Sequence, residues 1–517
     1  MDESIRAGQS SDVARQAKAS HGRDFMSDLT ELSMDSPKKA SGGLRSPWVD
    51  FRDTVSLGFW PIVSLLVMVG CLYAPVLKYE FLNLDDPAYI VENDLIKSWH
   101  PRSLWRVMTE PVARNYAPLT IGTFLVEHTL WGLNSSGYHA TNVLLHAINA
   151  VLVFVLIRQL TRHTWTAWMV AALFAVHPMQ VETVVWVASR KTLLSSTFML
   201  LSGLCYLRPG RTGKNEVWGA LWLVLGLLSK ASTVSIPPIV VAYDIFIRRK
   251  SFADAVVRQI LPGVLCVMLI NYTMSAQVSQ IGGTRDHLVM NKFQIAGVDA
   301  TLLFRYLSML AVPRQLCVYY APPWKGIWPQ IAVSVVIWSA VTVFLWRKQR
   351  QYPRRAFAWA AGLWLLFPVM NFFPITTLMN DRYMYLPCLA VMWMAVEGLR
   401  QVGARLAGSS TDREGDVGLG VWLTRAVCVV AIGAYACATQ HYLPVWRNPM
   451  TLWAYARQQT PSLIIVHRQW ADALHASGDI PAAIAELQDI LDHMHPDEGE
   501  ANLAKELQAK WAANASQ

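Results

Sequence analysis

The chain has 517 residues, of which 53% are hydrophobic and 16% are charged, and its mean hydropathy is positive. Soluble proteins carry charge on about a quarter of their residues, so this composition excludes a wholly soluble enzyme. The net charge of +9 comes mostly from short basic stretches between apolar runs, which indicates orientation in a membrane rather than nucleic-acid binding. We predict an all-α polytopic membrane protein.

The N-terminal part combines a polar tail with a first apolar run. Residues 1–50 are rich in Ser, Asp, Lys and Gly and lack the short hydrophobic centre of a signal peptide. We predict a disordered cytoplasmic tail at 1–50 and an uncleaved membrane anchor at 57–76. A polar stretch at about 77–136 follows, and we expect it to form the first extracytoplasmic loop.

That loop opens with two adjacent carboxylates, Asp85 and Asp86. Adjacent acids at a membrane surface are costly to hold there without a partner or a task. One interpretation is a general base that acts on a substrate arriving through the lipid. The alternative is a helix cap, because Asp is a good cap and Pro87 suits a first helical turn. The position of the pair does not choose between the two.

Basic residues between the apolar runs predict which loops are cytoplasmic. Further apolar runs lie near 137–157, 166–180, 191–207, 217–229, 232–247, 256–276, 297–312, 330–346, 356–374, 384–400 and 419–440. The predicted cytoplasmic loops are 158–162, 208–214, 248–250, 347–355 and 400–405. If 297–312 crossed the membrane, the block 347–355 would lie outside. We therefore predict about eleven spans and one re-entrant or interfacial segment at 297–312.

This topology gathers polar residues on the outer side. They include Asp85, Asp86, His177, Glu182, Lys230, Asp381 and Arg382, together with the C-terminus. Cations suit a lipid phosphate, a carboxylate can deprotonate an acceptor hydroxyl, and aromatic rings can stack on a sugar. The candidate phosphate-binding cations are Arg190, Lys191, Lys230 and Arg382. Each cation has the alternative role of reaching towards lipid headgroups.

Several polar residues lie inside apolar runs. His139, Asn142 and His146 share one helical face, and the absence of a carboxylate in register favours interhelical hydrogen bonds over metal ligation. His177 and Glu182 either orient a substrate or mark a kink followed by a capped helix. Asp244 is expected to pair with a nearby arginine. The cysteines show no metal-ligand spacing, so no metal site is predicted.

The C-terminal residues 442–517 differ from the rest in being acidic and soluble-looking, and we predict a small periplasmic helical domain. Residues 462–495 fit the tetratricopeptide period of about 34 residues, with Ala471, Ala483, the turn residue Gly478 and the closing Pro496 at suitable places. A plain helical hairpin is the alternative. Because a single repeat does not bury a core alone, we expect residues 450–495 to pack on the membrane domain or on a protein partner.

The order and spacing of several motifs resemble one family. They are LNLDDPAYIVEND, NYAPLT, WGLNSSGYHATNVLLHAINAVLVFVL, ALFAVHPMQVETVVWVASRKTLLS, GLLSKASTVSIPPIVVAYD and MNDRYMYLP, followed by the repeat. Over about residues 75–495 the chain resembles bacterial relatives of the transmembrane and tetratricopeptide-repeat O-mannosyltransferases, which belong to the GT-C superfamily allied to protein O-mannosyltransferases.

The resemblance implies a GT-C-like helical bundle over 51–441 with its catalytic centre beside the acidic pair. Asp85 or Asp86 would then be the base, and Arg190, Lys230 and Arg382 would hold the lipid phosphate. His177 and Glu182 would shape the sugar pocket. The full set of candidate substrate-binding residues is Tyr89, Tyr116, His139, His177, Glu182, Asp381 and Tyr383.

The family chemistry implied is a single displacement with inversion and no divalent metal. One residue departs from the family pattern. Ala117 stands where many relatives have Arg or His, and Arg114 is the candidate substitute.

The sequence thus predicts a multi-pass glycosyltransferase of the bacterial inner membrane, with its N-terminus cytoplasmic and its C-terminus periplasmic. Its partners would be a polyprenyl-phosphate-linked sugar as donor, a periplasmic or surface protein or glycan as acceptor, and membrane lipids, but no nucleic acid. The alternatives are a non-catalytic scaffold that acts through the repeat, and a lipid flippase or transporter. Transporters tend to place polar residues near the membrane midplane, which argues against the last.

Overall fold

A computed structural model describes residues 47–113, 115–278, 290–372, 377–406, 418–494 and 496–515. Two compact units make up the chain, Met1–Leu57 and Gly58–Gln517. Most of the first unit, including nearly all of the predicted tail, lies outside the described residues, as does Arg114. Within the described part all the elements are helices, and the one β-type contact there is an isolated bridge between Val112 and Asn115.

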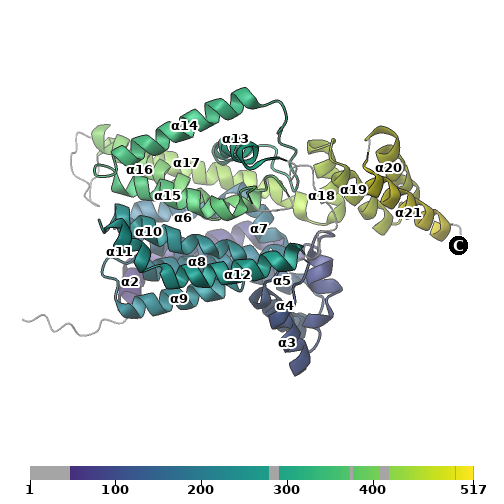
Figure 1. Cartoon of the computed structure of the whole chain (residues 1–517), viewed down its shortest axis with the longest axis horizontal. Helices are drawn as coiled ribbons and strands as arrows, with labels where there is room; N and C mark the ends of the chain where they lie inside the picture. Colours follow the sequence, from purple (N-terminus) through teal and green to yellow (C-terminus); the bar gives the residue numbers. More distant parts are fainter. Residues whose placement is uncertain are drawn as a thin grey trace, which may run out of the picture. The chain divides into compact units, whose positions relative to one another are not determined.

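The helices that precede the C-terminal domain form two consecutive sets (Figure 1). The first set is α2 (Pro47–Tyr73), η1 (Ala74–Lys78), η2 (Pro87–Val91), η3 (Asp94–Ile96), α3 (Pro101–Thr109), α4 (Pro118–Trp131), α5 (Ser135–Thr161), α6 (Thr164–Val176), η4 (Pro178–Gln180), α7 (Val181–Val185), η5 (Val187–Ser189) and α8 (Arg190–Tyr206). The second set is α9 (Gly213–Leu227), η6 (Ala231–Ser235), α10 (Ile236–Phe246), α11 (Phe252–Val257), α12 (Ile260–Val278), α13 (Lys292–Ala311), α14 (Trp328–Arg347), α15 (Pro353–Leu366), η8 (Phe367–Val369), η9 (Asp381–Met384), α16 (Cys388–Leu406) and α17 (Leu419–Tyr442).

Helix α5 shows how the sequence sets these elements. Its apolar stretch starts where the side chain of Asn134 accepts a hydrogen bond from the Ser136 amide at 3.1 Å, as a good N-cap does. It ends at Arg162, which adopts the left-handed conformation with φ 62°. Helices α6 and α8 pack on either side of α5, so its polar residues face other helices.

Fewer helices than predicted meet the length and hydropathy expected of a membrane span. Within the described ranges four do: Gly58–Lys78, Ser135–Thr161, Trp328–Arg347 and Leu419–Trp446. The pair Thr164–Val176 and Pro178–Val185, bent by 57°, would make a fifth. Several other predicted runs form shorter helices, such as α15 with 14 residues and α10 with 11. The predicted count of about eleven spans is therefore not confirmed, although the multi-pass membrane character is.

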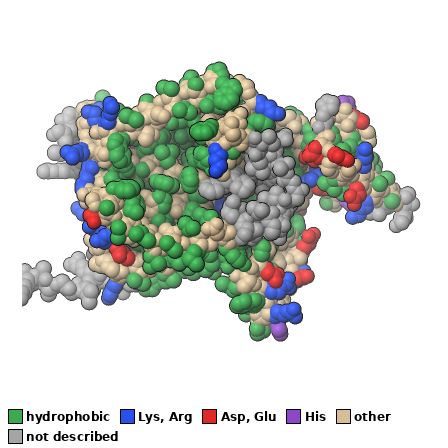
Figure 2. All heavy atoms as spheres, in the orientation of Figure 1, with side chains coloured by type: hydrophobic (Ala, Val, Ile, Leu, Met, Phe, Trp, Pro, Cys, Tyr) green, Lys and Arg blue, Asp and Glu red, His purple; other side chains and the backbone are tan. Residues whose placement is uncertain are grey.

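Three of the loops predicted to be cytoplasmic, 208–214, 248–250 and 347–355, lie together. Arg249 donates to the backbone oxygen of Gln349 at 3.0 Å, which joins the basic segments 248–250 and 347–355. Asp244 pairs with Arg211 at 2.9 Å and with Arg248 at 3.2 Å, so its predicted role as a local ion-pair partner is confirmed. Figure 2 shows hydrophobic side chains over much of one face of the bundle, with Lys and Arg gathered towards one end.

Helix α13, which covers the predicted re-entrant run, differs in direction from its neighbours. It is seen nearly end-on in Figure 1, whereas α14 runs across the view. Near its start Asp299 accepts from the Asn371 amide at 3.1 Å, and near its end the oxygen of Leu310 contacts His177. A helix that does not cross the membrane is expected to lie in this way, and its place in the bilayer stays a prediction.

The C-terminal residues form η10 (Leu443–Trp446), α18 (Pro449–Gln459), α19 (Ile464–Ala476), α20 (Ile480–His493) and α21 (Glu498–Ala515). Helices α19 and α20 make a hairpin whose turn holds Gly478 at φ 90°, and Ala471 and Ala483 are fully buried between them. The predicted helical pair is confirmed, while its assignment as a tetratricopeptide repeat stays a prediction. Trp453 of α18 belongs to the same buried core as the membrane helices, so α18 packs against them.

Candidate active site

The two carboxylates of the acidic pair lie in opposite environments. Asp86 is fully buried, and its two carboxylate oxygens accept backbone hydrogen bonds from Leu82 at 2.9 Å and from Ala188 at 2.8 Å. Burial raises the pKa of Asp86 to about 7, although these two hydrogen bonds act to lower it. Although Asp86 stands at the N-cap of η2, its side chain makes no capping bond. Asp86 thus fastens its loop to η5.

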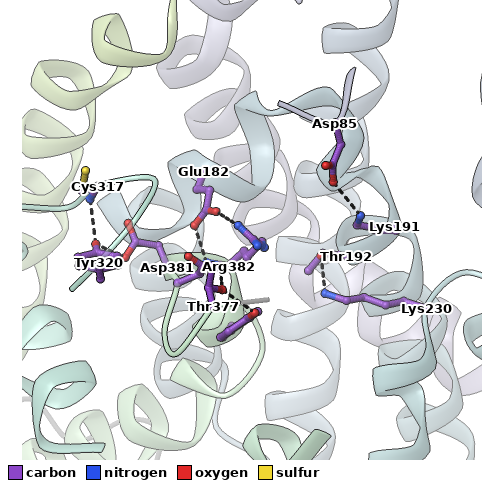
Figure 3. A network of polar contacts seen from close by, with 12 residues as sticks. Asp85, Glu182, Lys191, Thr192, Lys230, Cys317, Tyr320, Thr377, Asp381 and Arg382 are labelled. Atoms are coloured by element: carbon purple, nitrogen blue, oxygen red, sulfur yellow. Dashed lines mark hydrogen bonds and ion pairs between the residues drawn. The ribbon is translucent and has the colours of Figure 1, made fainter. Parts of the chain in front are cut away.

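Asp85 is the accessible member of the pair. Its side chain is 40% exposed and pairs with Lys191 of α8 at 3.4 Å (Figure 3). The Lys191 ammonium also lies 3.3 Å from the hydroxyl of Tyr89, above whose ring it sits at 4.8 Å. A carboxylate that is partly exposed and held beside a cation can take a proton from a substrate hydroxyl. The geometry therefore favours Asp85 over Asp86 as a base.

Lys191 is one of several cations near the pair. Arg382 lies 5.0 Å from the centre of the Trp186 ring, and Lys191 lies 6.0 Å from the same centre. Lys230 donates to the hydroxyl of Thr192 at 2.9 Å. Burial lowers the pKa of Lys230 to about 7, and the charges of Lys191 and Arg382 add to this effect. We name Lys191, Lys230 and Arg382 the cation cluster.

Two buried acidic residues lie near Arg382, and one of them, Glu182, holds it in place. Glu182, which is fully buried, accepts from the Arg382 amide at 2.9 Å and also pairs with its guanidinium. Asp381 is fully buried too and accepts from the Tyr320 hydroxyl at 2.6 Å (Figure 3). Burial and the nearby Glu182 raise the pKa of Asp381 well above its usual range. Glu182 therefore positions the arginine, whereas Asp381 holds Tyr320, and both carboxylates are buried.

Arg190 is separated from the cation cluster although it precedes Lys191. Its side chain is fully buried, pairs with Glu127 at 2.9 Å, donates to the Tyr138 oxygen at 2.8 Å and bonds Asn142. Every branch of the guanidinium is used inside the protein. Consecutive helical residues point about 100° apart, so neighbours in sequence reach different surroundings. Arg190 links α4, α5 and α8, and nothing in its contacts provides for a donor phosphate.

The histidines predicted near the site have structural surroundings. His177 accepts from the Met179 amide at 3.2 Å and contacts the Leu310 oxygen at 3.0 Å, so it caps η4 and braces α13. His146 contacts the Tyr385 hydroxyl at 2.8 Å and the Ala175 oxygen at 3.0 Å. Asn142 bonds the backbone of Val184 at 3.1 Å, which together with His146 confirms interhelical hydrogen bonding on this face of α5. His139 is buried near Arg190.

Two of the three tyrosines predicted to bind substrate border the cation cluster, and the third does not. Tyr89 is buried against Lys191, and the Tyr383 ring lies 5.4 Å from the Arg382 guanidinium, so both border the cation cluster. Tyr116 instead bonds the Met108 oxygen at 2.9 Å and packs edge-on against Tyr272 at 4.6 Å. The structure does not bring Tyr116 into contact with the acidic pair or the cations.

Sequence reasoning missed Glu127, Trp186, Thr192 and Tyr320. Glu127 had a signal, because a lone acid in the apolar helix α4 calls for a buried partner. The other residues are common types without a distinguishing pattern. Among the described residues the group with metal-ligand geometry is His467, Glu486 and Asp489, which belongs to α19 and α20 rather than to the site around Asp85.

Fold and site together define a helical membrane protein with an accessible carboxylate beside a cluster of cations. Comparison with known proteins finds relatives of this chain, although no family model matches its sequence. Protein O-mannosyl-transferase F38B6.6 of Caenorhabditis elegans is 24% identical over 350 residues, which cover 63% of this chain and 50% of the relative. Human protein O-mannosyl-transferase TMTC2 is 31% identical over 211 residues, or 37% of this chain and 24% of the relative. The homologues are thus protein O-mannosyl-transferases, which confirms the resemblance, and the chain spans half or less of their length.

Solved structures also resemble the chain at the level of helix arrangement. An oligosaccharyltransferase of Archaeoglobus fulgidus tethered to an acceptor peptide aligns with a TM-score of 0.44 and 11% identity, over 76% of this chain and 56% of that one. ArnT from Cupriavidus metallidurans bound to undecaprenyl phosphate aligns with a TM-score of 0.37 and 13% identity, over 86% and 82% of the two chains.

Proposed function

We propose that the chain is a GT-C type glycosyltransferase of the plasma membrane, which moves a sugar from a polyprenyl-phosphate donor to a hydroxyl group of a protein or glycan acceptor. Its homologues are protein O-mannosyl-transferases, which supports the class of reaction. The observation that carries the proposal is Asp85, partly exposed, held by Lys191 within a cluster of cations. We propose that both face the extracytoplasmic side.

The positive charges of the cation cluster are only partly neutralised, which favours the binding of an anion. Glu182 neutralises Arg382, and Asp85 lies at the edge of contact with Lys191. Lys230 donates to the hydroxyl of Thr192 and forms no ion pair with a carboxylate within the described residues. A phosphate group would satisfy Lys230 and would form charge-assisted hydrogen bonds that strengthen as negative charge develops on it.

The proposed reaction is a single displacement. Asp85 accepts the proton of the acceptor hydroxyl while the hydroxyl oxygen attacks the anomeric carbon of the sugar. The bond between that carbon and the phosphate oxygen breaks, and its electron pair stays on the polyprenyl phosphate. The cation cluster stabilises this leaving group, and attack from the opposite face inverts the anomeric configuration.

The remaining candidate residues are proposed to position this machinery. Asp86 holds the loop of the base, Glu182 holds Arg382, and His177 braces the turn before α7. Tyr89 and Tyr383 border the cations and are proposed to contact the sugar or phosphate. We also propose that these protein cations, rather than a divalent metal, neutralise the leaving group.

The test compares acceptors from cells with the wild-type chain, a deletion, and the deletion complemented with Asp85→Asn or Asp86→Asn. Mass spectrometry of envelope proteins and glycolipids should show one species that loses a sugar-sized mass in the deletion and in Asp85→Asn. Purified Asp85→Asn should transfer about 10²- to 10⁴-fold more slowly, with an unchanged melting temperature, because it loses a base but no packing. The assays contain a chelator, which should not reduce the wild-type rate.

Asp86→Asn is the matched control, because the same substitution there removes one acceptor for a backbone N–H. It should lower the unfolding free energy by about 1–3 kcal/mol, which the melting temperature reports. Full transfer by Asp85→Asn would end its assignment as the base. An envelope altered by the deletion but restored by Asp85→Asn would instead support the scaffold alternative.

A further inference from the structure

The C-terminal helices contact the loop of the proposed base at the side chain of Asn83. Asn83, just before Asp85, accepts from the indole nitrogen of Trp453 in α18 at 2.6 Å. Its amide nitrogen donates to the side chain of Gln469 in α19 at 3.1 Å. Both ends of the Asn83 amide are thus held by the C-terminal domain. Nearby, the Glu80 amide donates to the oxygen of Arg447 at 3.0 Å.

Trp453 also reaches the segment that leads to the cation cluster. Its ring, fully buried, stacks on Tyr319 with centroids 6.1 Å apart and planes at 22°. The next residue, Tyr320, donates to Asp381, which precedes Arg382 in η9 (Figure 3). One indole therefore connects the loop of the base with the segment of a phosphate-binding cation.

The loop of Asp85 is held from two directions. On the side of the membrane helices, Asp86 fastens it to Leu82 and Ala188. On the other side, Trp453 and Gln469 hold Asn83. A loop fixed at residues on either side of Asp85 keeps the base at a defined place relative to Arg382. Displacement of a catalytic group by as little as about 1 Å can reduce a rate by about 100-fold.

We propose that the C-terminal helices complete the active site, with Asn83, Trp453 and Gln469 as positioning residues for Asp85. This inference rests on the proposed function, because it assigns a role to Asp85 as the base. It differs from the scaffold alternative, in which the chain acts through the repeat without catalysis. Loosening the junction lowers kcat and leaves donor binding intact, because the cation cluster keeps its own contacts.

The variants are chosen to break the junction from both sides. Trp453→Phe keeps a ring against Tyr319 but removes the indole donor, and Asn83→Ala removes both side-chain bonds while leaving Trp453 in place. Gln469→Leu removes an acceptor that Gln469→Glu retains. The matched control is Trp511→Phe in α21, where the indole is also buried and stacks on His475 at 4.4 Å, within the separate core of the C-terminal helices.

Steady-state transfer by the purified full chain should show kcat about tenfold lower in Trp453→Phe, Asn83→Ala and Gln469→Leu, with the KM for the donor unchanged. Gln469→Glu should restore most of the rate, and Trp511→Phe should match the wild type. The double variant Asn83→Ala with Trp453→Phe should be no slower than Asn83→Ala alone, because both substitutions remove the same contact.

Hydrogen–deuterium exchange over residues 79–93 gives a readout that does not need activity. The junction variants should exchange faster there, and Trp511→Phe should not. Unchanged exchange and unchanged kcat in Trp453→Phe and Asn83→Ala would overturn the inference, as would a higher donor KM with wild-type kcat. Faster exchange in the junction variants, combined with no transfer by the wild-type chain, would overturn the proposed function while leaving the positioning of the loop established.

Discussion

Asp85 and Asp86 show how far one residue of separation can change a side chain's role. Both carboxylate oxygens of Asp86 accept hydrogen bonds from backbone N–H groups, and one of these groups belongs to Ala188, 102 residues away. Asp85 keeps 40% of its side chain exposed beside Lys191. The sequence identified the pair but left open which carboxylate is accessible, because the partner that buries Asp86 comes from a distant segment.

Arg190 and Lys191 divide in the same way. Both were predicted to bind the donor phosphate, but Arg190 is enclosed by Glu127, Tyr138 and Asn142, while Lys191 faces Asp85. The helical rotation between neighbours was predictable from the sequence, whereas the partners on each side were not.

If Lys230 binds the donor phosphate as proposed, donor binding is expected to depend on pH. Because burial lowers the pKa of Lys230 to about 7, the unoccupied protein loses this charge as the pH rises through that value. A bound phosphate needs the ammonium form, so the affinity for the donor should fall above pH 7, by up to about tenfold per pH unit, and be level below it. Measuring the donor's dissociation constant between pH 6 and 9 tests this.

Lys230→Arg is the comparison for that experiment, because a guanidinium stays protonated throughout the range. Its affinity should change little with pH. A wild-type affinity that is constant from pH 6 to 9, or an equal fall in Lys230→Arg, would show that Lys230 is not the titrating group.

At the scale of elements, the C-terminal helices are joined by a buried charged contact. His467 of α19 lies 2.5 Å from Glu486 of α20, and Arg457 of α18 reaches the same carboxylate at 2.8 Å. The hydrogen bond to Glu486 raises the pKa of His467, although burial acts to lower it. Burial acts to raise the pKa of Glu486, but the bonds from His467 and Arg457 outweigh it and the pKa is lowered.

These shifts predict how the stability of the helical domain depends on pH. A histidine with a raised pKa stabilises the fold fully below its unfolded pKa of about 6.5, and this contribution is lost as the pH rises through the folded value. Glu486 contributes above its unfolded pKa of about 4.3 and loses its contribution as the pH falls through its lowered value. The domain should therefore be most stable near pH 5–6.5 and lose about 1 kcal/mol at higher pH.

Thermal unfolding of the purified chain at pH 6 and pH 8.5 measures the difference. The difference in stability between the two pH values should be smaller in His467→Gln than in the wild type, because glutamine cannot titrate. In His493→Gln it should equal the wild-type difference, since His493 is 74% exposed and pairs with Asp489 at the surface. An identical pH dependence in wild type and His467→Gln would contradict the assignment to this contact.

At the scale of the whole molecule, the basic loops predict which side of the membrane each end faces. The contacts of Arg249 with Gln349 and of Asp244 with Arg211 join these loops. In a cysteine-free background, Arg350→Cys should be protected from a membrane-impermeant maleimide in intact cells, and Lys505→Cys in α21 should react once the outer membrane is permeabilised. Reaction of Arg350→Cys from outside would show that the topology is wrong.

The sequence alone determined the membrane-spanning helical character, the family resemblance, the acidic pair, the basic loops and the C-terminal hairpin. These properties depend on composition, local periodicity and motif order, which can be read directly from the sequence. The tertiary structure decided which carboxylate is exposed, which cations gather near it, and that Trp453 holds Asn83, 370 residues away. Such features arise only when packing brings distant segments together and burial removes competing water, so no local pattern encodes them.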